Sequence, residues 1–165
     1  DLCTGNGSLA IICAMAYPDV SVVGADISED ALQVARINNE RLQASVHFDK
    51  LDILEGEYSS DSKFNLIVSN PPYVLESEKS LMKRNVLENE PSVALFVKDN
   101  DPLLFYKKIV QFAEQQLHSG GKIYFEINEG LGNDMKDLLS SFSYSSIELR
   151  NDLFERDRMI RATKK

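Results

Sequence analysis

The sequence predicts an α/β fold built on a doubly wound, mostly parallel sheet. Two observations predict it: β-branched runs of strand length alternate with helical segments along the chain, and short polar turns join them. A length of 165 residues suits a single domain, since domains usually hold about 100 to 200 residues. Ligands of such sheets bind at the carboxyl ends of the strands, so polar residues that follow strands form the candidate site.

The elements follow in order from the first residue. Residues 1–3 indicate the end of a strand, so we expect one domain over residues 1–165 whose opening edge is truncated. Pro18 ends the first helix, Ser28 caps the second, and Asp101 with Pro102 starts the third. We expect helices over 9–17, 29–42, 101–120 and 133–141, and strands over 20–25, 46–51, 64–69, 122–128, 145–149 and 158–162. Residues 70–100 form a long irregular segment with a short helix near 79–85, and a loop of that length is usually functional.

The charge and the apolar pattern exclude some classes of protein. The chain has 18 basic and 26 acidic side chains, and a net charge of -8 repels phosphate backbones, which argues against nucleic acid as a partner. The longest apolar run, residues 9–16, is too short to cross a bilayer, and no basic-then-apolar signal segment opens the chain. We therefore expect a cytoplasmic protein with no membrane partner.

The cysteines and histidines give little support to a disulfide or a metal site. Cys3 and Cys13 lack the spacing of a CxxC motif, which favours two buried, small apolar residues. His47 and His118 are isolated from each other and from any cysteine cluster. No metal is expected.

Gly5-Asn6-Gly7 lies between the first strand and its helix, where glycine permits a tight turn and a close approach of ligand to backbone. Asp26 ends the second strand, where a carboxylate can accept the hydroxyls of an adenosine ribose. Asp52 follows the third strand, near the place of an adenine. These features predict a nucleoside site, although Gly5, Gly7 and Ala10 with Asp26 downstream also satisfy the fingerprint of NAD-binding proteins.

Asn70-Pro71-Pro72-Tyr73 follows directly after the strand over 64–69. The two prolines fix their φ angles and donate no hydrogen bond, so the turn is stiff and the Pro71 carbonyl is free to accept. If this carbonyl and the Asn70 carboxamide accept both hydrogens of a substrate NH2 group, the nitrogen lone pair is turned out of conjugation. Tyr73 offers a flat face for stacking. The turn predicts transfer of a methyl group to a planar amide or amine nitrogen, and hydride transfer has no use for it.

With residues 1–7, Asp26 and residues 70–73 in this order, the chain resembles the class I methyltransferases. More closely, it resembles the HemK-type protein-(glutamine) methyltransferases, which modify the Gly-Gly-Gln loop of peptide-chain release factors. The similarity continues through segments over most of the chain: 90–95, 105–109, 120–122, 126–127, 152–153 and 156–158. The chain departs from the family at Cys3, Asn128 and Glu155, where glycine is usual.

The resemblance implies S-adenosyl-L-methionine as the cofactor and a release factor as the partner. It also implies a helical N-terminal domain that helps to grip the release factor and is absent from residues 1–165. The implied cofactor residues are Cys3, Thr4, Gly5, Asn6 and Gly7 at the methionine end, Asp26 with Ile27 at the ribose, and Asp52 with Ile53 at the adenine. The implied catalytic residues are Asn70, Pro71, Pro72 and Tyr73. Of these, Asn70 and Pro71 hold the glutamine amide, and Asn70 also borders the cofactor.

Two alternatives to glutamine methylation remain at this point. The same glycine loop and Asn-Pro-Pro-Tyr turn occur in enzymes that methylate an exocyclic amine of adenine or guanine in DNA or RNA. A non-catalytic nucleotide-binding module would bind the cofactor without turnover. The net charge argues against the first, and the intact turn over residues 70–73 argues against the second.

Overall fold

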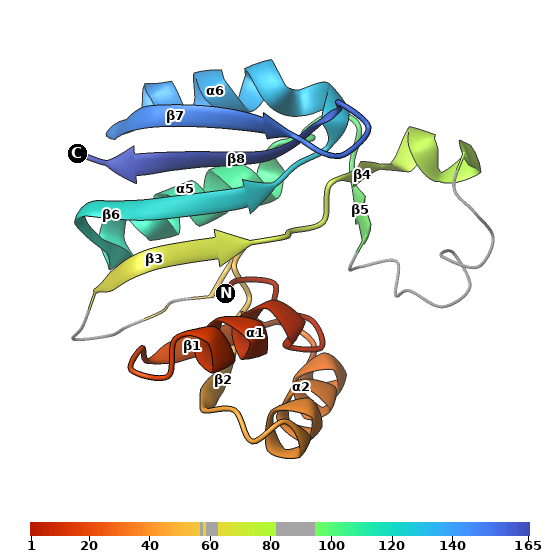
Figure 1. Cartoon of the computed structure of the whole chain (residues 1–165). Helices are drawn as coiled ribbons and strands as arrows, with labels where there is room; N and C mark the ends of the chain where they lie inside the picture. Colours follow the sequence, from red (N-terminus) through yellow and green to blue (C-terminus); the bar gives the residue numbers. More distant parts are fainter. Residues whose placement is uncertain (57, 59–62, 82–94) are drawn as a thin grey trace. The chain divides into compact units, whose positions relative to one another are not determined.

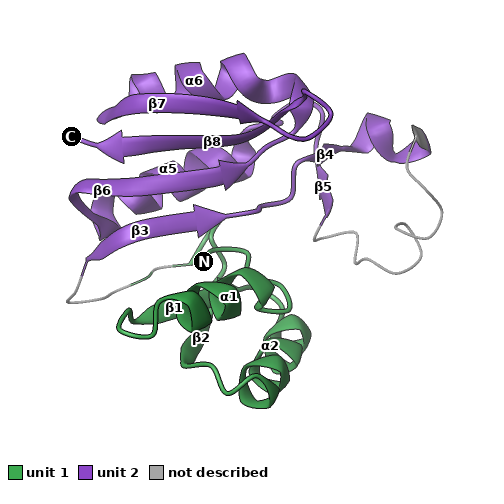
Figure 2. Ribbon diagram, viewed as in Figure 1, with its two compact units in different colours: residues 1–61 green, residues 62–165 purple. Residues whose placement is uncertain are grey.

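A computed structural model describes residues 1–56, 58, 63–81 and 95–165 (Figure 1). The chain forms two compact units, residues 1–61 and residues 62–165 (Figure 2). The short helix expected near 79–85 lies partly outside the described residues. Residues 90–94, which belong to one of the segments similar to the HemK type, lie wholly outside them. The expectation of a single domain over residues 1–165 stays a prediction.

The first unit is a strand, helix, strand arrangement on a parallel pair. Strand β1 (Val22–Asp26) pairs in parallel with β2 (Val46–Lys50), and Leu2 forms an isolated bridge with Ala25. Helix α1 (Ser8–Ala16) precedes β1, and α2 (Glu29–Arg41) connects β1 to β2. The Ser28 hydroxyl accepts a hydrogen bond from the Ala31 amide at 3.2 Å, which confirms the predicted cap of α2. The core consists of Ala10, Ile11, Ala14, Leu32, Ala35, Val46 and Phe48.

The second unit contains a four-stranded sheet in the order β3-β6-β8-β7. Its strands are β3 (Phe64–Ser69), β6 (Leu117–Glu126), β7 (Tyr144–Asn151) and β8 (Asp157–Lys164). Helices α5 (Leu104–Gln116) and α6 (Gly132–Ser141) both lie behind this sheet in the view of Figure 1. Tyr106 of α5 meets Phe125 of β6 edge to face, with ring centroids 5.4 Å apart, and both side chains are buried.

Short elements follow the carboxyl ends of β3 and β6. Strand β4 (Val74–Leu75) continues from the Asn70-to-Tyr73 turn and pairs in parallel with β5 (Phe96–Val97). The 3-10 helix η1 (Glu76–Leu81) follows β4, and a second 3-10 helix, η2 (Glu129–Leu131), follows β6. The irregular segment expected after residue 70 therefore contains short regular pieces.

The largest differences from the predicted boundaries lie at the start of α5 and at the junction of α5 with β6. Helix α5 begins at Leu104 instead of near Asp101, because residues 101–103 form a turn in which the Asp101 carbonyl accepts from the Leu104 amide at 3.2 Å. Strand β6 begins at Leu117, within the range expected for the helix, because Leu117 pairs with Phe64 of β3. The Leu117 side chain is fully buried.

The α/β class is confirmed, and the sheet is mixed. The pairs β1-β2, β3-β6 and β4-β5 are parallel, whereas β6-β8 and β7-β8 are antiparallel. Residues 152–156 alone connect β7 to β8, and a parallel crossover needs about a dozen residues or more, so this connection has to be a hairpin.

The structure also bears on the expectations about disulfides, metal ions and membrane spans. Cys3 and Cys13 are not joined in a disulfide, and each is half-buried, whereas we expected both to be buried. Among the described residues, no cluster of three or more His, Cys, Asp or Glu side chains could hold a metal ion. Within the same part of the chain, every helix is too short or too polar to traverse a lipid bilayer.

Candidate active site

In the first unit, the Asp26 carboxylate fastens the glycine loop to the start of α2. Its Oδ2 accepts from the Gly5 amide at 2.8 Å, and its Oδ1 accepts from the Ser28 amide at 3.0 Å. A carboxylate has about four lone-pair positions, so about two stay available on this half-buried side chain. Asp26 can thus hold the loop and still accept hydroxyl groups of a ribose.

The two loop glycines are needed for different reasons. Gly5 has φ +55°, and a Cβ added to it would meet nothing within 4 Å. A Cβ on Gly7, with φ +79°, would lie 2.9 Å from the Ala35 Cβ and 2.9 Å from the Phe48 Cζ. The backbone at Gly5 is therefore open to a ligand, which fits a cofactor at this loop. Gly7 instead allows the loop to pack against α2 and β2, a role that the local sequence does not show.

Further contacts hold the rest of this loop. The Asn6 side-chain Oδ1 accepts from the Ser8 amide at 3.1 Å, and the Asn6 carbonyl accepts from the Asn38 side chain at 3.0 Å. The Thr4 amide donates to the Ala25 carbonyl at 3.0 Å. Cys3 has φ +59°, a left-handed backbone conformation that glycine adopts without strain.

Asp52 lies at the same edge of the parallel pair as Asp26. The Leu51 amide donates to the Asp26 carbonyl at 2.9 Å, which joins the chain after β2 to the end of β1. The Asp52 Oδ1 accepts from the Leu54 amide at 2.9 Å. Ile27 is 46% exposed and Ile53 is half-buried, so both apolar side chains are available beside this edge. The structure therefore brings residues 3–7, Asp26 and Asp52 together on one edge of the first unit.

In the second unit, the turn over residues 70–73 follows β3, and its expected acceptors have no donor within the described part of the chain. Asn70 is exposed, and Pro71 and Pro72 are buried. Among the described residues, nothing donates a hydrogen bond to the Asn70 carboxamide or to the Pro71 carbonyl. Two acceptors on a stiff turn are what the orientation of a substrate NH2 group needs.

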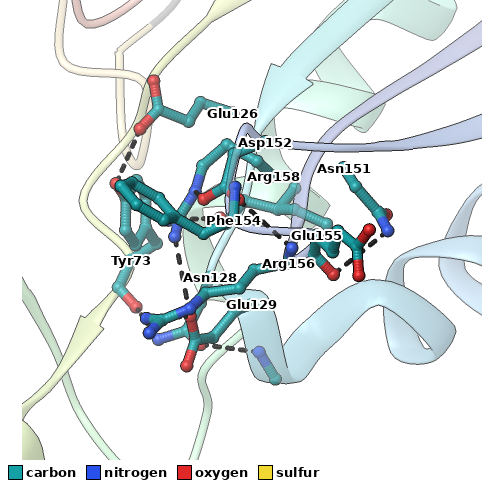
Figure 3. Close-up of polar contacts among 12 residues, drawn as sticks. Tyr73, Glu126, Asn128, Glu129, Asn151, Asp152, Phe154, Glu155, Arg156 and Arg158 are labelled. Carbon is teal, nitrogen blue, oxygen red and sulfur yellow. Dashed lines mark hydrogen bonds and ion pairs between the residues drawn. The ribbon is translucent and has the colours of Figure 1, made fainter.

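Tyr73 is fixed through its hydroxyl (Figure 3). The phenol donates to the Glu126 Oε1 at 2.7 Å, and the ring is half-buried. Burial, followed by the hydrogen bond to Glu126, raises the pKa of Tyr73 to about 12, so the phenol is neutral near pH 7. The predicted stacking of this ring on a substrate stays a prediction.

Sequence reasoning gave no role to Glu126 and Asn128, which contact the turn. Glu126 ends β6 and accepts from the Tyr73 hydroxyl, and the Asn128 side-chain Nδ2 donates to the Tyr73 carbonyl at 3.2 Å. Their place at the end of the strand expected over 122–128 is a sequence signal that could have made them candidates, but the parallel pairing of β6 with β3, which puts them beside the turn, comes from the structure.

A network of charged side chains holds the β7-β8 connection against the end of β6 (Figure 3). The Arg158 guanidinium contacts Asp152 Oδ2 at 3.4 Å and donates to the Ile127 carbonyl at 3.3 Å. Glu129 Oε2 accepts from Arg156 at 3.0 Å. Burial alone would raise the pKa of Asp152, but hydrogen bonds from the backbone amides of Arg156 and Phe154 and from Arg158 lower it overall. The carboxylate that organises this connection is thus stabilised in its charged form.

Solved structures show the fold of the chain. The chain matches a methyltransferase from Pyrococcus furiosus with a TM-score of 0.69, at 20% identity, over 98% of this chain and 71% of that one. It matches the ribosomal protein L11 methylase from Lactobacillus delbrueckii subsp. bulgaricus with a TM-score of 0.67, at 20% identity, over 100% and 68%. The fold is that of the class I S-adenosylmethionine-dependent methyltransferases.

Sequence comparison gives the family. Residues 1–137 match the family model described as methyltransferase domain, and the chain belongs to this family. It is 43% identical over 164 residues to the release factor glutamine methyltransferase of Bacteroides thetaiotaomicron, covering 99% of this chain and 59% of that protein. It is 42% identical over 161 residues to the protein of the same name from Flavobacterium psychrophilum, covering 98% and 56%. The chain thus spans less than two thirds of the length of these relatives.

These matches bear on the alternatives left by the sequence. The family model and the names of the relatives support S-adenosyl-L-methionine as the cofactor, and they disfavour the interpretation of the glycine loop as an NAD site. The names of the relatives do not favour methylation of DNA or RNA. The individual cofactor and catalytic residues stay predictions.

Proposed function

We propose that this chain is the catalytic part of a protein-(glutamine-N5) methyltransferase, which transfers a methyl group to a glutamine side chain of a peptide-chain release factor. The observation that carries the proposal is the turn after β3: no described residue donates to the acceptors of Asn70 and Pro71, which sit on a stiff backbone. The names of the curated relatives support the choice of substrate.

The edge of the first unit is assigned to the cofactor. Asp26 accepts the ribose hydroxyls, and Ile27 lies beside the ribose. Asp52 and Ile53 flank the adenine. The methionine end lies on the loop of Cys3, Thr4, Gly5, Asn6 and Gly7. The open backbone at Gly5 and the remaining lone pairs of Asp26 support this assignment. S-adenosyl-L-methionine supplies a methyl group on a positively charged sulfur, which is electrophilic.

The turn in the second unit is assigned to the acceptor. An amide nitrogen is a poor nucleophile because its lone pair is delocalised into the carbonyl. Asn70 and the Pro71 carbonyl accept hydrogen bonds from the two N–H groups and turn the lone pair out of conjugation, and methyl transfer requires this nitrogen at a near-attack distance of about 3 to 3.5 Å from the methyl carbon. The nitrogen-carbon bond forms as the sulfur-carbon bond breaks, and the nitrogen releases one proton to water. Pro72 keeps the turn stiff, and Tyr73 packs beside the substrate.

The partner is assigned at finer detail as the Gly-Gly-Gln loop of the release factor. A glutamine preceded by two glycines presents an unhindered amide that can enter a turn exposed at Asn70. Release factors act on ribosomes, which places the enzyme in the cytoplasm. A net charge of -8 disfavours binding to DNA or RNA by long-range repulsion.

A direct assay tests this function. The chain is incubated with methyl-labelled S-adenosylmethionine and, in parallel, with a purified bacterial release factor, with the same factor carrying Ala for the loop glutamine, and with DNA and RNA. Label on the unchanged release factor alone supports the proposal. Label on nucleic acid, or equal label on the factor that lacks the glutamine, contradicts it.

A further inference from the structure

We propose that Asn128 is a positioning residue for the methyl-acceptor turn, an inference that rests on the proposed function. Its carboxamide ties the Tyr73 carbonyl to the segment after β6 and to η1. The Nδ2 group donates to the Tyr73 carbonyl at 3.2 Å and to the Glu78 Oε2 at 3.0 Å, and the Oδ1 accepts from the Gly130 amide at 2.9 Å. Asn128 thus joins three segments of the second unit.

The contacts of Asn128 leave little freedom for this side chain. Both N–H groups and the oxygen are engaged, and the residue is only 8% exposed. The Glu78 carboxylate that accepts one of these bonds also accepts from the Leu75 amide at 2.9 Å, so η1 and β4 are part of the same assembly. A buried amide with satisfied hydrogen bonds holds its partners in a defined arrangement.

The contact at Tyr73 affects the acceptors because of the prolines. Tyr73 is held at two points, through its hydroxyl by Glu126 and through its carbonyl by Asn128 (Figure 3). The φ angles of Pro71 and Pro72 are fixed by their rings, so few torsions between Tyr73 and Asn70 can absorb a displacement. A shift of the Tyr73 carbonyl is therefore passed on to the Pro71 carbonyl and the Asn70 side chain.

Asn128 also has a structural task, since its oxygen caps η2 through the Gly130 amide. The change Asn128→Asp separates the two tasks. Aspartate keeps an oxygen for Gly130, but it presents an acceptor to the Tyr73 carbonyl and to the Glu78 carboxylate, which repel it. In the parent the Glu78 Oε2 accepts from both the Leu75 amide and Asn128. Adding Glu78→Gln removes the repelling charge, and after a small rotation the glutamine amide donates to the new carboxylate while its oxygen accepts from the Leu75 amide. The double variant restores the bond to η1, whereas the Tyr73 carbonyl still faces an acceptor.

The experiment measures kcat, KM for S-adenosylmethionine and thermal unfolding of the full chain with release factor as substrate. Hydrogen exchange of residues 74–81 reports on η1. The control is Asn133→Asp, the same chemical change on an exposed residue of α6. We expect Asn128→Asp to lower kcat by about 10²-fold, the scale of a misplaced reacting group, with KM for the cofactor unchanged. The double variant should regain the melting temperature and the exchange protection while its kcat stays low.

Each outcome decides between the two roles. If both kcat and the melting temperature of the double variant return to the parent values, Asn128 is structural only and the positioning role is wrong. A kcat of Asn128→Asp equal to that of Asn133→Asp would also overturn it. A parent chain that methylates DNA or RNA and not release factor contradicts the proposed function itself, which is a different result from a parent active on release factor with an unaffected Asn128 variant.

Discussion

The hydroxyl of Tyr73 donates to the carboxylate of Glu126 across 2.7 Å, although 53 residues separate them in the chain. The contact joins the turn after β3 to the last residue of β6, its parallel neighbour in the sheet. It requires a protonated phenol, and burial and the hydrogen bond to Glu126 both favour that form. The turn that carries the acceptors is thereby attached to the rigid sheet.

This contact predicts a loss of stability at alkaline pH. The pKa of Tyr73 is raised from 10.0 to about 12, so the folded chain holds this proton more tightly than the unfolded chain. The contribution is present in full below pH 10 and is lost as the pH rises toward 12. Tyr106 and Tyr144 also have raised pKa values because they are buried, so the parent must be compared with Tyr73→Phe. Urea unfolding across this range should show a steeper fall for the parent. If the free energy of unfolding falls equally with pH in the parent and in Tyr73→Phe, the raised pKa is not that of Tyr73.

Asn70 is predicted to orient the substrate amide. Asn70→Ala should lower turnover by about 10² to 10³, the scale for loss of one preorganised polar contact. Stability should change little, because the side chain is exposed and makes no hydrogen bond among the described residues. Initial rates with release factor and circular dichroism measure the two effects. Asn133→Ala, at another exposed asparagine of the second unit, serves as the control, and equal rates for both variants would remove Asn70 from the mechanism.

Asp26 is predicted to anchor the cofactor. Hydrogen bonds to a charged group contribute about 1.5 to 3 kcal/mol, so Asp26→Ala should weaken S-adenosylmethionine binding by roughly 10- to 150-fold. Calorimetric titration measures the affinity, and a melting curve checks the fold, because Asp26 also accepts from the Gly5 and Ser28 amides. The exposed Asp19 provides a control, Asp19→Ala. An unchanged affinity in a folded Asp26→Ala chain would show that the ribose site lies elsewhere.

The two loop glycines should respond differently to the same change. Gly7→Ala places a Cβ within 2.9 Å of Ala35 and Phe48, so it should destabilise the chain by about 1 to 3 kcal/mol through overpacking. Gly5→Ala meets open space and should stay folded, with about 1 to 2 kcal/mol of backbone strain, but its methyl group occupies the surface assigned to the cofactor. Cofactor affinity measured at a temperature where both variants are folded tests this. Full affinity in Gly5→Ala would exclude a ligand from this backbone.

Glu155 is predicted to be a strained position. Its φ of +62° lies in the left-handed region, which costs a residue with a Cβ about 1 to 2 kcal/mol. Glu155→Gly should therefore stabilise the chain, by about 1 kcal/mol once the greater backbone entropy of unfolded glycine is included. Glu40→Gly, in the exposed part of α2, should destabilise it by a similar amount. The order of the two melting temperatures checks the prediction, and a destabilised Glu155→Gly would contradict it.

The sequence by itself determined the features that depend on neighbouring residues. Strand β3 covers residues 64–69 as predicted, the Ser28 cap starts α2, and the turn over residues 70–73 follows its strand. Hydrophobic periodicity, cap chemistry and proline geometry are local properties, and they can be recognised without knowledge of the rest of the chain. The rule that ligands bind at the carboxyl ends of parallel strands then selected the candidate site.

The tertiary structure alone decided which distant residues support that site. Nothing near Tyr73 in the sequence indicates that Glu126 holds its hydroxyl and Asn128 its carbonyl, because both contacts arise from the pairing of β3 with β6. The need for glycine at residue 7 likewise comes from Ala35 and Phe48, which approach it only when α2 and β2 pack together. Such contacts depend on packing between elements far apart in the chain, and local sequence patterns carry no information on the distances involved.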